Sequence, residues 1–185
     1  MRTKFSSISE CITVWARQSQ DKGESGNVSF SGGVLYSYSL AIANILDGAT
    51  LIYGGSNSVT TNRHVCLARR AAPGKLLPVA FVETDPYTTS FRHGNNMGEM
   101  VNSMVTAADK WARARRLKDY RRSEVLGHAG RFIRYVRLFD LGEMAAVQYP
   151  MLMDVIALND FDALRAWCSE WETVNAVMNR IGGEQ

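Results

Sequence analysis

The stretch VSFSGGVLYSYSLAIANILDGATLIY, residues 28–53, decides the fold. Polar and apolar residues alternate in its first half, which is the period of a half-buried β-strand. Gly32-Gly33 and Asp47-Gly48 interrupt the pattern, and both pairs are typical of two-residue hairpin turns. The stretch therefore predicts an antiparallel β-meander of three or four strands.

A helix is expected on each side of this meander. Ser7 and Glu10 have the spacing of a capping box, and the apolar stripe that follows predicts a helix over residues 8–20. Thr60 or Thr61 is expected to cap the second helix, which a Pro-Gly pair ends.

A short strand is expected over residues 76–82, and helical spacing continues from about residue 96 to the end. Pro78 has no amide hydrogen, so that strand is expected either at an edge of the sheet or to begin after the proline. The order of elements predicts an α+β fold, a small antiparallel β-meander with an N-terminal helix followed by a mainly helical C-terminal half. The polar loop within residues 85–96 suggests two parts, 1–90 and 91–185, which can also pack as one compact domain.

The composition is that of an ordinary globular protein, with 46% hydrophobic and 21% charged residues among 185. No segment approaches the roughly 20 apolar residues that cross a membrane, and the N-terminus lacks the apolar run of a secretory signal. Cys11, Cys66 and Cys168 are odd in number and far apart, which favours free thiols and leaves their reactivity open. We therefore expect a cytoplasmic protein with no membrane partner, metal or other cofactor.

The distribution of charge is the strongest compositional signal. Residues 1–108 carry 9 basic and 7 acidic groups, residues 109–137 carry 10 and 3, and residues 138–185 carry 2 and 8. The middle segment is thus +7 and the C-terminal segment −6. Such segregation predicts homo-oligomers in which the basic middle of one copy meets the acidic part of another.

Arginine and lysine at this density attract nucleic-acid phosphates without reading sequence. Trp111, Tyr120 and Tyr135 are interleaved with them and are candidates for stacking on bases, as are Tyr36 and Tyr38, which alternation places on one sheet face. Two alternatives stay open: a solvated basic face paired with the acidic C-terminal helices, and an acidic protein partner. The basic candidates are Arg113, Arg115, Arg116, Lys118, Arg121, Arg122, Arg131 and Arg134.

A second candidate anion site lies at the predicted helix start around Thr60, Thr61, Arg63 and His64. Hydroxyl groups and free backbone amides at a helix N-terminus favour an anion, and Arg63 adds charge. Ordinary helix capping explains the same residues. The GxxxxGK[ST] pattern of a phosphate-binding loop does not occur.

Short motifs of the N-terminal half resemble a family of uncharacterised proteins encoded by bacteriophages. They are VWARQSQ, LYSYSLAIA and NSVTTNRH followed by ARRA, within roughly residues 10–75. The resemblance implies a small phage protein of the host cytosol, of the kind that acts in host takeover, inhibits a host defence or binds nucleic acid. It assigns no catalytic residue.

These observations lead to three hypotheses. The first is a non-enzymatic phage accessory protein that binds nucleic acid, or a host nucleic-acid-handling complex, through the Arg-rich helices. The second is an inhibitor of a host protein that uses its charged surfaces. The third is an enzyme with a site near Thr61, Arg63 and His64.

Overall fold

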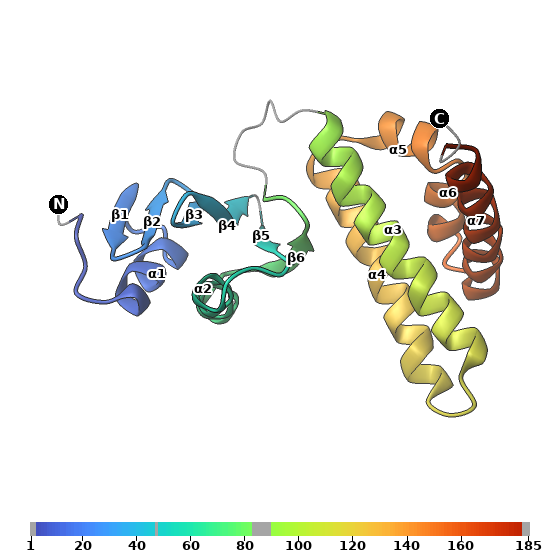
Figure 1. Ribbon diagram of the computed structural model, residues 1–185, viewed down its shortest axis with the longest axis horizontal. Coiled ribbons are helices and arrows are strands. Elements are labelled where there is room, and N and C mark those ends of the chain that lie inside the picture. The colour runs from blue at the N-terminus through green and yellow to red at the C-terminus, as the bar shows by residue number, and fades with distance from the viewer. Residues whose placement is uncertain (1–2, 47, 83–89, 183–185) are drawn as a thin grey trace. The chain divides into compact units, whose positions relative to one another are not determined.

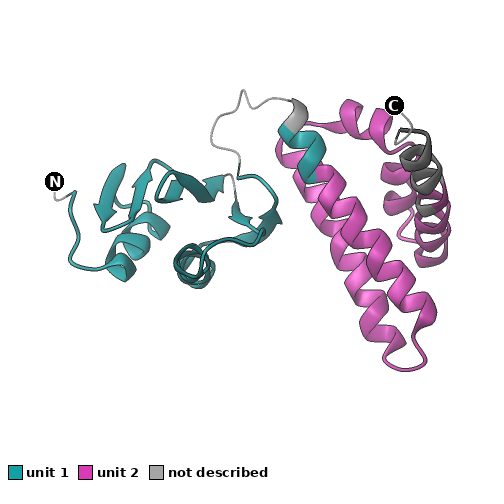
Figure 2. Cartoon of the chain, viewed as in Figure 1, with its two compact units in different colours: residues 1–96 teal, residues 97–185 magenta. Residues whose placement is uncertain are grey.

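The computed structural model describes residues 3–46, 48–82 and 90–182, and its fold is α+β as predicted (Figure 1). Contacts within the chain divide it into two compact units, residues 1–96 and 97–185 (Figure 2). The sequence placed this boundary between residues 90 and 91.

The first unit holds a sheet of six strands in the described part of the chain, ordered as they occur in the sequence. The first five pair antiparallel, and the sixth lies parallel to the fifth. The strands are β1 (Lys22–Ser25), β2 (Val28–Ser31), β3 (Val34–Ser37), β4 (Leu40–Leu46), β5 (Ala49–Tyr53) and β6 (Lys75–Val79). The predicted meander is confirmed, and β1 was missed because its sequence, KGES, lacks an apolar alternation.

The hairpin turns have two residues each. Gly32 has a φ of 53°, and Ser31 pairs with Val34 across the Gly32-Gly33 turn, as predicted. Leu46 pairs with Ala49 across the predicted Asp47-Gly48 turn, of which Asp47 lies outside the described residues. Because glycine has no Cβ atom, it adopts these positive φ angles without strain.

Two helices accompany the sheet, α1 (Ile8–Ala16) and α2 (Val59–Ala71). Ser7 caps α1 as predicted, but the helix ends four residues before the predicted end. The cap of α2 is Ser58, whose Oγ accepts from the Thr61 N–H at 3.2 Å. The prediction of Thr60 or Thr61 as the cap was wrong, because Ser58 already supplies the side-chain oxygen and the non-helical backbone, with ψ 155°, that a cap requires.

The core of this unit lies between the two helices and one face of the sheet. Its largest side chains include Trp15 of α1, Leu35 of β3, and Ile42 and Ile52 of the central strands. The Trp15 indole N–H also donates to the Gly33 carbonyl at 2.7 Å. A Cβ at Gly33 would lie 2.6 Å from the Ile45 carbonyl oxygen, so the turn fits only glycine here.

Pro78 lies in β6 at an edge of the sheet, as predicted. Phe81 lies just after this strand. The buried Asn96 side chain accepts from the Phe81 N–H at 2.8 Å and donates to the Phe81 carbonyl at 2.9 Å. These two bonds satisfy backbone groups that would otherwise lack a strand partner. Asn96 belongs to the first part of the long helix α3.

The second unit is helical and follows the predicted apolar spacing. Buried methionines line α3, and aromatic rings join the later helices: Phe132 meets Tyr149 edge to face at 5.6 Å between centroids, and Tyr149 contacts Trp171 at 5.3 Å. Among the described residues, no helix is both long and apolar enough to span a bilayer. The helices are α3 (Ser90–Arg113), α4 (Lys118–Leu138), α5 (Gly142–Gln148), α6 (Leu152–Ala157) and α7 (Phe161–Gly182).

Candidate nucleic-acid interface

The Arg-rich segment forms a turn between two helices. The sequence predicted helix throughout, with charge on most of its circumference, but α3 ends at Arg113 and α4 begins at Lys118. Leu117 starts α4 from the left-handed conformation, with φ 59° and ψ 33°. The turn was missed because this connection contains neither glycine nor proline. We call residues 110–122 the hairpin tip.

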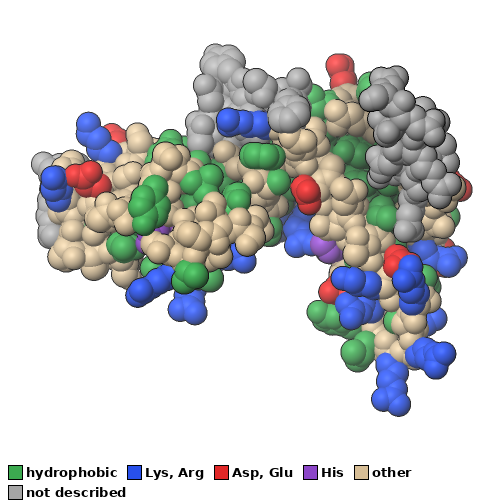
Figure 3. Space-filling view, viewed as in Figure 1, with side chains coloured by type: hydrophobic (Ala, Val, Ile, Leu, Met, Phe, Trp, Pro, Cys, Tyr) green, Lys and Arg blue, Asp and Glu red, His purple; other side chains and the backbone are tan. Residues whose placement is uncertain are grey.

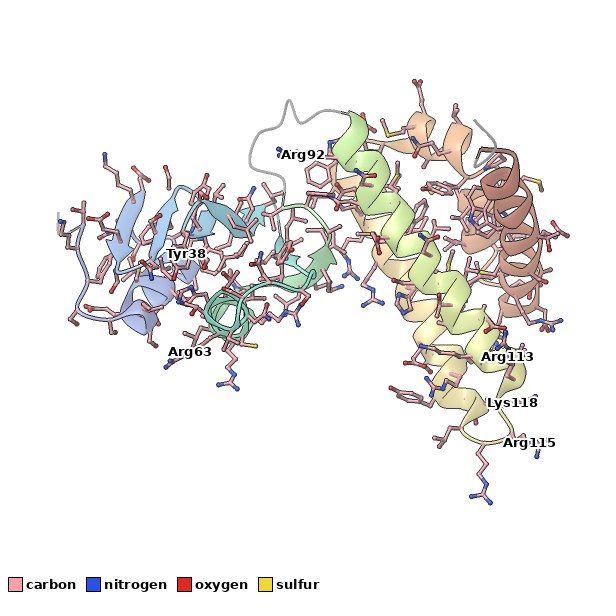
Figure 4. The ribbon with its side chains drawn as sticks, in the orientation of Figure 1. Tyr38, Arg63, Arg92, Arg113, Arg115 and Lys118 are labelled. Atoms are coloured by element: carbon pink, nitrogen blue, oxygen red, sulfur yellow. The ribbon has the colours of Figure 1, made fainter. Side chains whose placement is uncertain are left out.

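The hairpin tip contains seven basic residues and one acidic residue, Asp119, for a formal charge of +6. Figure 3 shows Lys and Arg side chains gathered over this end of α3 and α4, with apolar side chains beside them. Arg113, Arg115 and Lys118 lie together at this end of the helical unit (Figure 4). The basic residues are Lys110, Arg113, Arg115, Arg116, Lys118, Arg121 and Arg122.

Only part of this charge is neutralised. Arg113 pairs with Asp109 at 2.8 Å and Arg121 with Glu124 at 2.6 Å, both within their own helix. Among the described side chains, no ion pair joins residues 109–137 to the acidic residues after 137. The alternative that the acidic helices neutralise the basic ones therefore finds no support in these residues.

Aromatic rings lie against some of these cations. The Lys118 ammonium lies 5.1 Å from the centroid of Trp111, and the Arg122 guanidinium 5.0 Å from that of Phe161. Trp111 in turn meets Phe161 edge to face at 5.0 Å, so it belongs to the base of the tip. Such cation–π contacts restrain the side chains and leave their charged ends hydrated.

Two of the predicted stacking residues do not lie where the sequence placed them. Tyr135 is fully buried, because it belongs to the apolar stripe of α4. Tyr38 lies in the turn after β3 with φ 56° and shares no sheet face with the half-buried Tyr36; its hydroxyl accepts from the Asn27 side chain at 2.9 Å. The aromatic that projects at the tip is Tyr120, which is 59% exposed.

Arg131 and Arg134 lie further along α4, where both are half-buried. Arg131 donates from Nη2 to Nδ1 of His128, and burial lowers its pKa. Burial, and then the charge of Arg131, lowers the pKa of His128 to about 4. Arg131 therefore serves a contact within the helix, and the exposed charge is concentrated at the hairpin tip.

The four residues of the second predicted site do not form one surface. Thr60 and Arg63 are exposed on α2, whereas Thr61 and His64 are buried against the sheet. His64 Nδ1 lies 2.8 Å from Ser37 Oγ of β3. Sequence analysis missed Ser37, because a serine in an alternating strand carries no signal of its partner.

The Ser37–His64 pair has the atoms of a nucleophile and its base, but not the access. The two side chains are 1% and 2% exposed, so a substrate does not reach the hydroxyl in this structure. Burial, and then the charge of Arg63, lowers the pKa of His64 and favours the neutral ring. The pair acts as a polar contact between α2 and the sheet.

The cysteines and possible metal ligands offer no competing site in the described residues. Burial raises the pKa of Cys11 to about 11 and that of Cys168 to about 12, so both remain thiols at neutral pH. Cys66 is exposed on α2. Within the described ranges, no three His, Cys, Asp or Glu residues converge as metal ligands.

The hairpin tip is thus the surface on which six of the eight predicted basic residues converge, all but Arg131 and Arg134. Comparison with models of protein families, with curated proteins and with solved structures gives no match.

Proposed function

We propose that this protein is a non-enzymatic accessory protein that binds nucleic acid through the hairpin tip. One observation carries the proposal: five exposed cations of the tip have no carboxylate within 4.0 Å among the described side chains. They are Lys110, Arg115, Arg116, Lys118 and Arg122. The resemblance of the N-terminal half to phage proteins supports an accessory role in a bacterial host.

The electrostatics favour a polyanion over a single small anion. The five cations extend over 13 residues of two helices and their connection, so one phosphate group does not satisfy them. A nucleic-acid backbone offers phosphates in series, and each phosphate neutralised releases condensed counterions. Five such contacts predict a slope of log affinity against log salt of about −3.5 to −4.5.

The test removes charge from the turn itself. Arg115→Gln with Arg116→Gln should reduce affinity for a labelled oligonucleotide at least tenfold in low salt. It should also make the salt slope shallower by about 1.4 to 1.8, because two phosphate contacts are lost. Fluorescence anisotropy from 25 mM salt upwards measures both quantities.

The control removes two charges from the first unit. Arg17 and Lys22 are exposed, so Arg17→Gln with Lys22→Gln changes the net charge by the same amount. This control should retain affinity within about twofold. Equal losses in the two double variants would show that net charge, and not the hairpin tip, drives binding.

A host protein is the second candidate partner, favoured by the same charge segregation. An Arg-rich surface also fits an acidic protein, and the −6 segment after residue 137 also fits a basic one. Capture from host lysate after nuclease treatment separates the two candidates. A partner that survives this treatment and is lost with the Arg115/Arg116 double variant would favour direct protein contact.

A further inference from the structure

Two apolar side chains project among the cations of the hairpin tip. Leu117 is 72% exposed and Tyr120 is 59% exposed, and Lys118 and the exposed Asp119 lie between them in the sequence. No acidic residue occurs in the connection between the helices. An exposed leucine and an exposed tyrosine within a strongly charged surface form a feature that electrostatic attraction alone does not explain.

The other aromatic rings near the tip are already used in packing. Trp111 and Phe161 contact each other, and both lie under cations. Tyr120 differs, since it is mostly exposed and its ring contacts the Arg121 guanidinium, 5.7 Å from the centroid. One ring at the tip therefore remains accessible from solvent, next to cations that attract phosphate.

The backbone holds the second apolar side chain in place at a cost. Leu117 adopts the left-handed conformation, which is unfavourable for a residue other than glycine, asparagine or aspartate. Its carbonyl accepts from the Arg121 N–H at 3.0 Å, so the conformation is built into the first turn of α4. Strained, exposed residues of this kind cluster at ligand-binding sites.

From these observations we infer that the hairpin tip binds single-stranded nucleic acid, with a base on Tyr120 and apolar contact from Leu117. This inference rests on the proposed function and specifies its substrate class. In a single strand, the base faces are available to an aromatic ring without the unpairing and unstacking that a duplex requires. The surrounding cations then neutralise the phosphates on both sides of the stacked base.

The experiment compares a 20-nucleotide DNA strand, an RNA strand of the same sequence and the DNA duplex at one salt concentration. Wild type should bind one or both single strands at least tenfold more tightly than the duplex. Tyr120→Ala should lose about tenfold on the single strand, which is about 1.4 kcal/mol. It should lose less than twofold on the duplex and leave the salt slope unchanged, because no charge is removed.

Two controls separate stacking from general damage. Tyr120→Phe keeps the ring and should bind as wild type does, and Leu158→Ala removes a leucine that is 71% exposed at the end of α6 and should change nothing. Thermal melts of all variants confirm that each is folded. Leu117→Ala should weaken single-strand binding three- to tenfold without weakening duplex binding.

The outcomes distinguish this inference from the proposed function. Loss of binding in the Arg115/Arg116 variant together with full binding by Tyr120→Ala would overturn the inference and leave nucleic-acid binding intact. If wild type binds the duplex more tightly than the single strands, the inference is also overturned and nucleic-acid binding again stays intact. That result would favour insertion of Leu117 between base pairs of the duplex. If wild type binds no oligonucleotide in low salt, both the inference and the proposed function are overturned.

Discussion

Ser37 and His64 make a buried polar contact between strand β3 and helix α2. Replacing Ser37 by alanine would leave His64 Nδ1 without this partner at a site where water does not enter easily. An unsatisfied buried polar group costs about 1–3 kcal/mol, so Ser37→Ala should lower the free energy of unfolding by about that amount. Urea denaturation followed by far-UV circular dichroism measures the change.

Thr60 provides the matched control for this prediction. It is exposed and lies in the same helix, but it is not the cap. Thr60→Ala should therefore change the free energy of unfolding by less than about 0.5 kcal/mol. An equally small change in Ser37→Ala would show that the contact with His64 is not needed for stability.

His128 predicts a pH dependence of stability. Its pKa is lowered to about 4 in the folded protein, against 6.5 as its ordinary value. Between these two pH values the unfolded chain binds a proton that the folded chain does not, so the free energy of unfolding should fall as pH decreases from 6.5 towards 4. Urea midpoints at several pH values measure this dependence.

Other groups also titrate below pH 6, so the contribution of His128 is measured as the difference between the pH profiles of stability of wild type and a variant without this histidine. His128→Gln removes the titration and should flatten the pH profile between 4 and 6.5 relative to wild type. Parallel profiles for the two proteins in this range would assign the acid sensitivity to other groups.

Among the elements, the connection between α3 and α4 has a strained backbone at Leu117, which local sequence preference does not explain. Leu117 lies in the left-handed region and is mostly exposed, so neither propensity nor burial favours leucine there. Leu117→Gly should relieve the strain and raise the free energy of unfolding by about 0.5–1 kcal/mol. Thermal and urea unfolding check the stability.

The same variant should bind a single strand less well, because the apolar side chain is lost. A gain in stability with a loss in binding is the pattern expected when a strained residue is retained for function. Destabilisation by Leu117→Gly would instead mean that the leucine contributes packing to the helical unit.

Element prediction from sequence succeeded where a pattern is local and failed where a single backbone angle decides. The β-hairpins were predictable because Gly32 and Gly48 lie between alternating segments. Tyr38 was assigned to a strand because its turn contains no glycine, proline or asparagine to mark it. The turn at Leu117, between α3 and α4, was missed for the same reason.

For the whole molecule, the segregation of charge predicts salt-dependent self-association. The hairpin tip carries +6, and residues 138–185 carry −6. Copies should associate in low salt, with the basic surface of one meeting the acidic surface of another, and dissociate when screening shortens the range of the attraction. Multi-angle light scattering at 25 mM and 500 mM salt measures the mass.

The Arg115/Arg116 double variant should lower the low-salt mass towards that of the 20.6 kDa monomer. An oligonucleotide that occupies the tip should have the same effect on wild type, since both compete for one set of cations. A monomer under all conditions, well above micromolar concentration, would contradict the prediction.

The sequence by itself determined the α+β class, the β-meander, most helices and the location of the excess positive charge. These follow from periodicity, turn residues and composition, which are local properties. Only the tertiary structure decided which groups meet: it buried Tyr135, Thr61 and His64, and placed Ser37 against His64. Such contacts join residues far apart in the chain, so no local pattern records them. The structure likewise turned an apparent basic helix into a hairpin tip, because one residue adopts a left-handed φ angle.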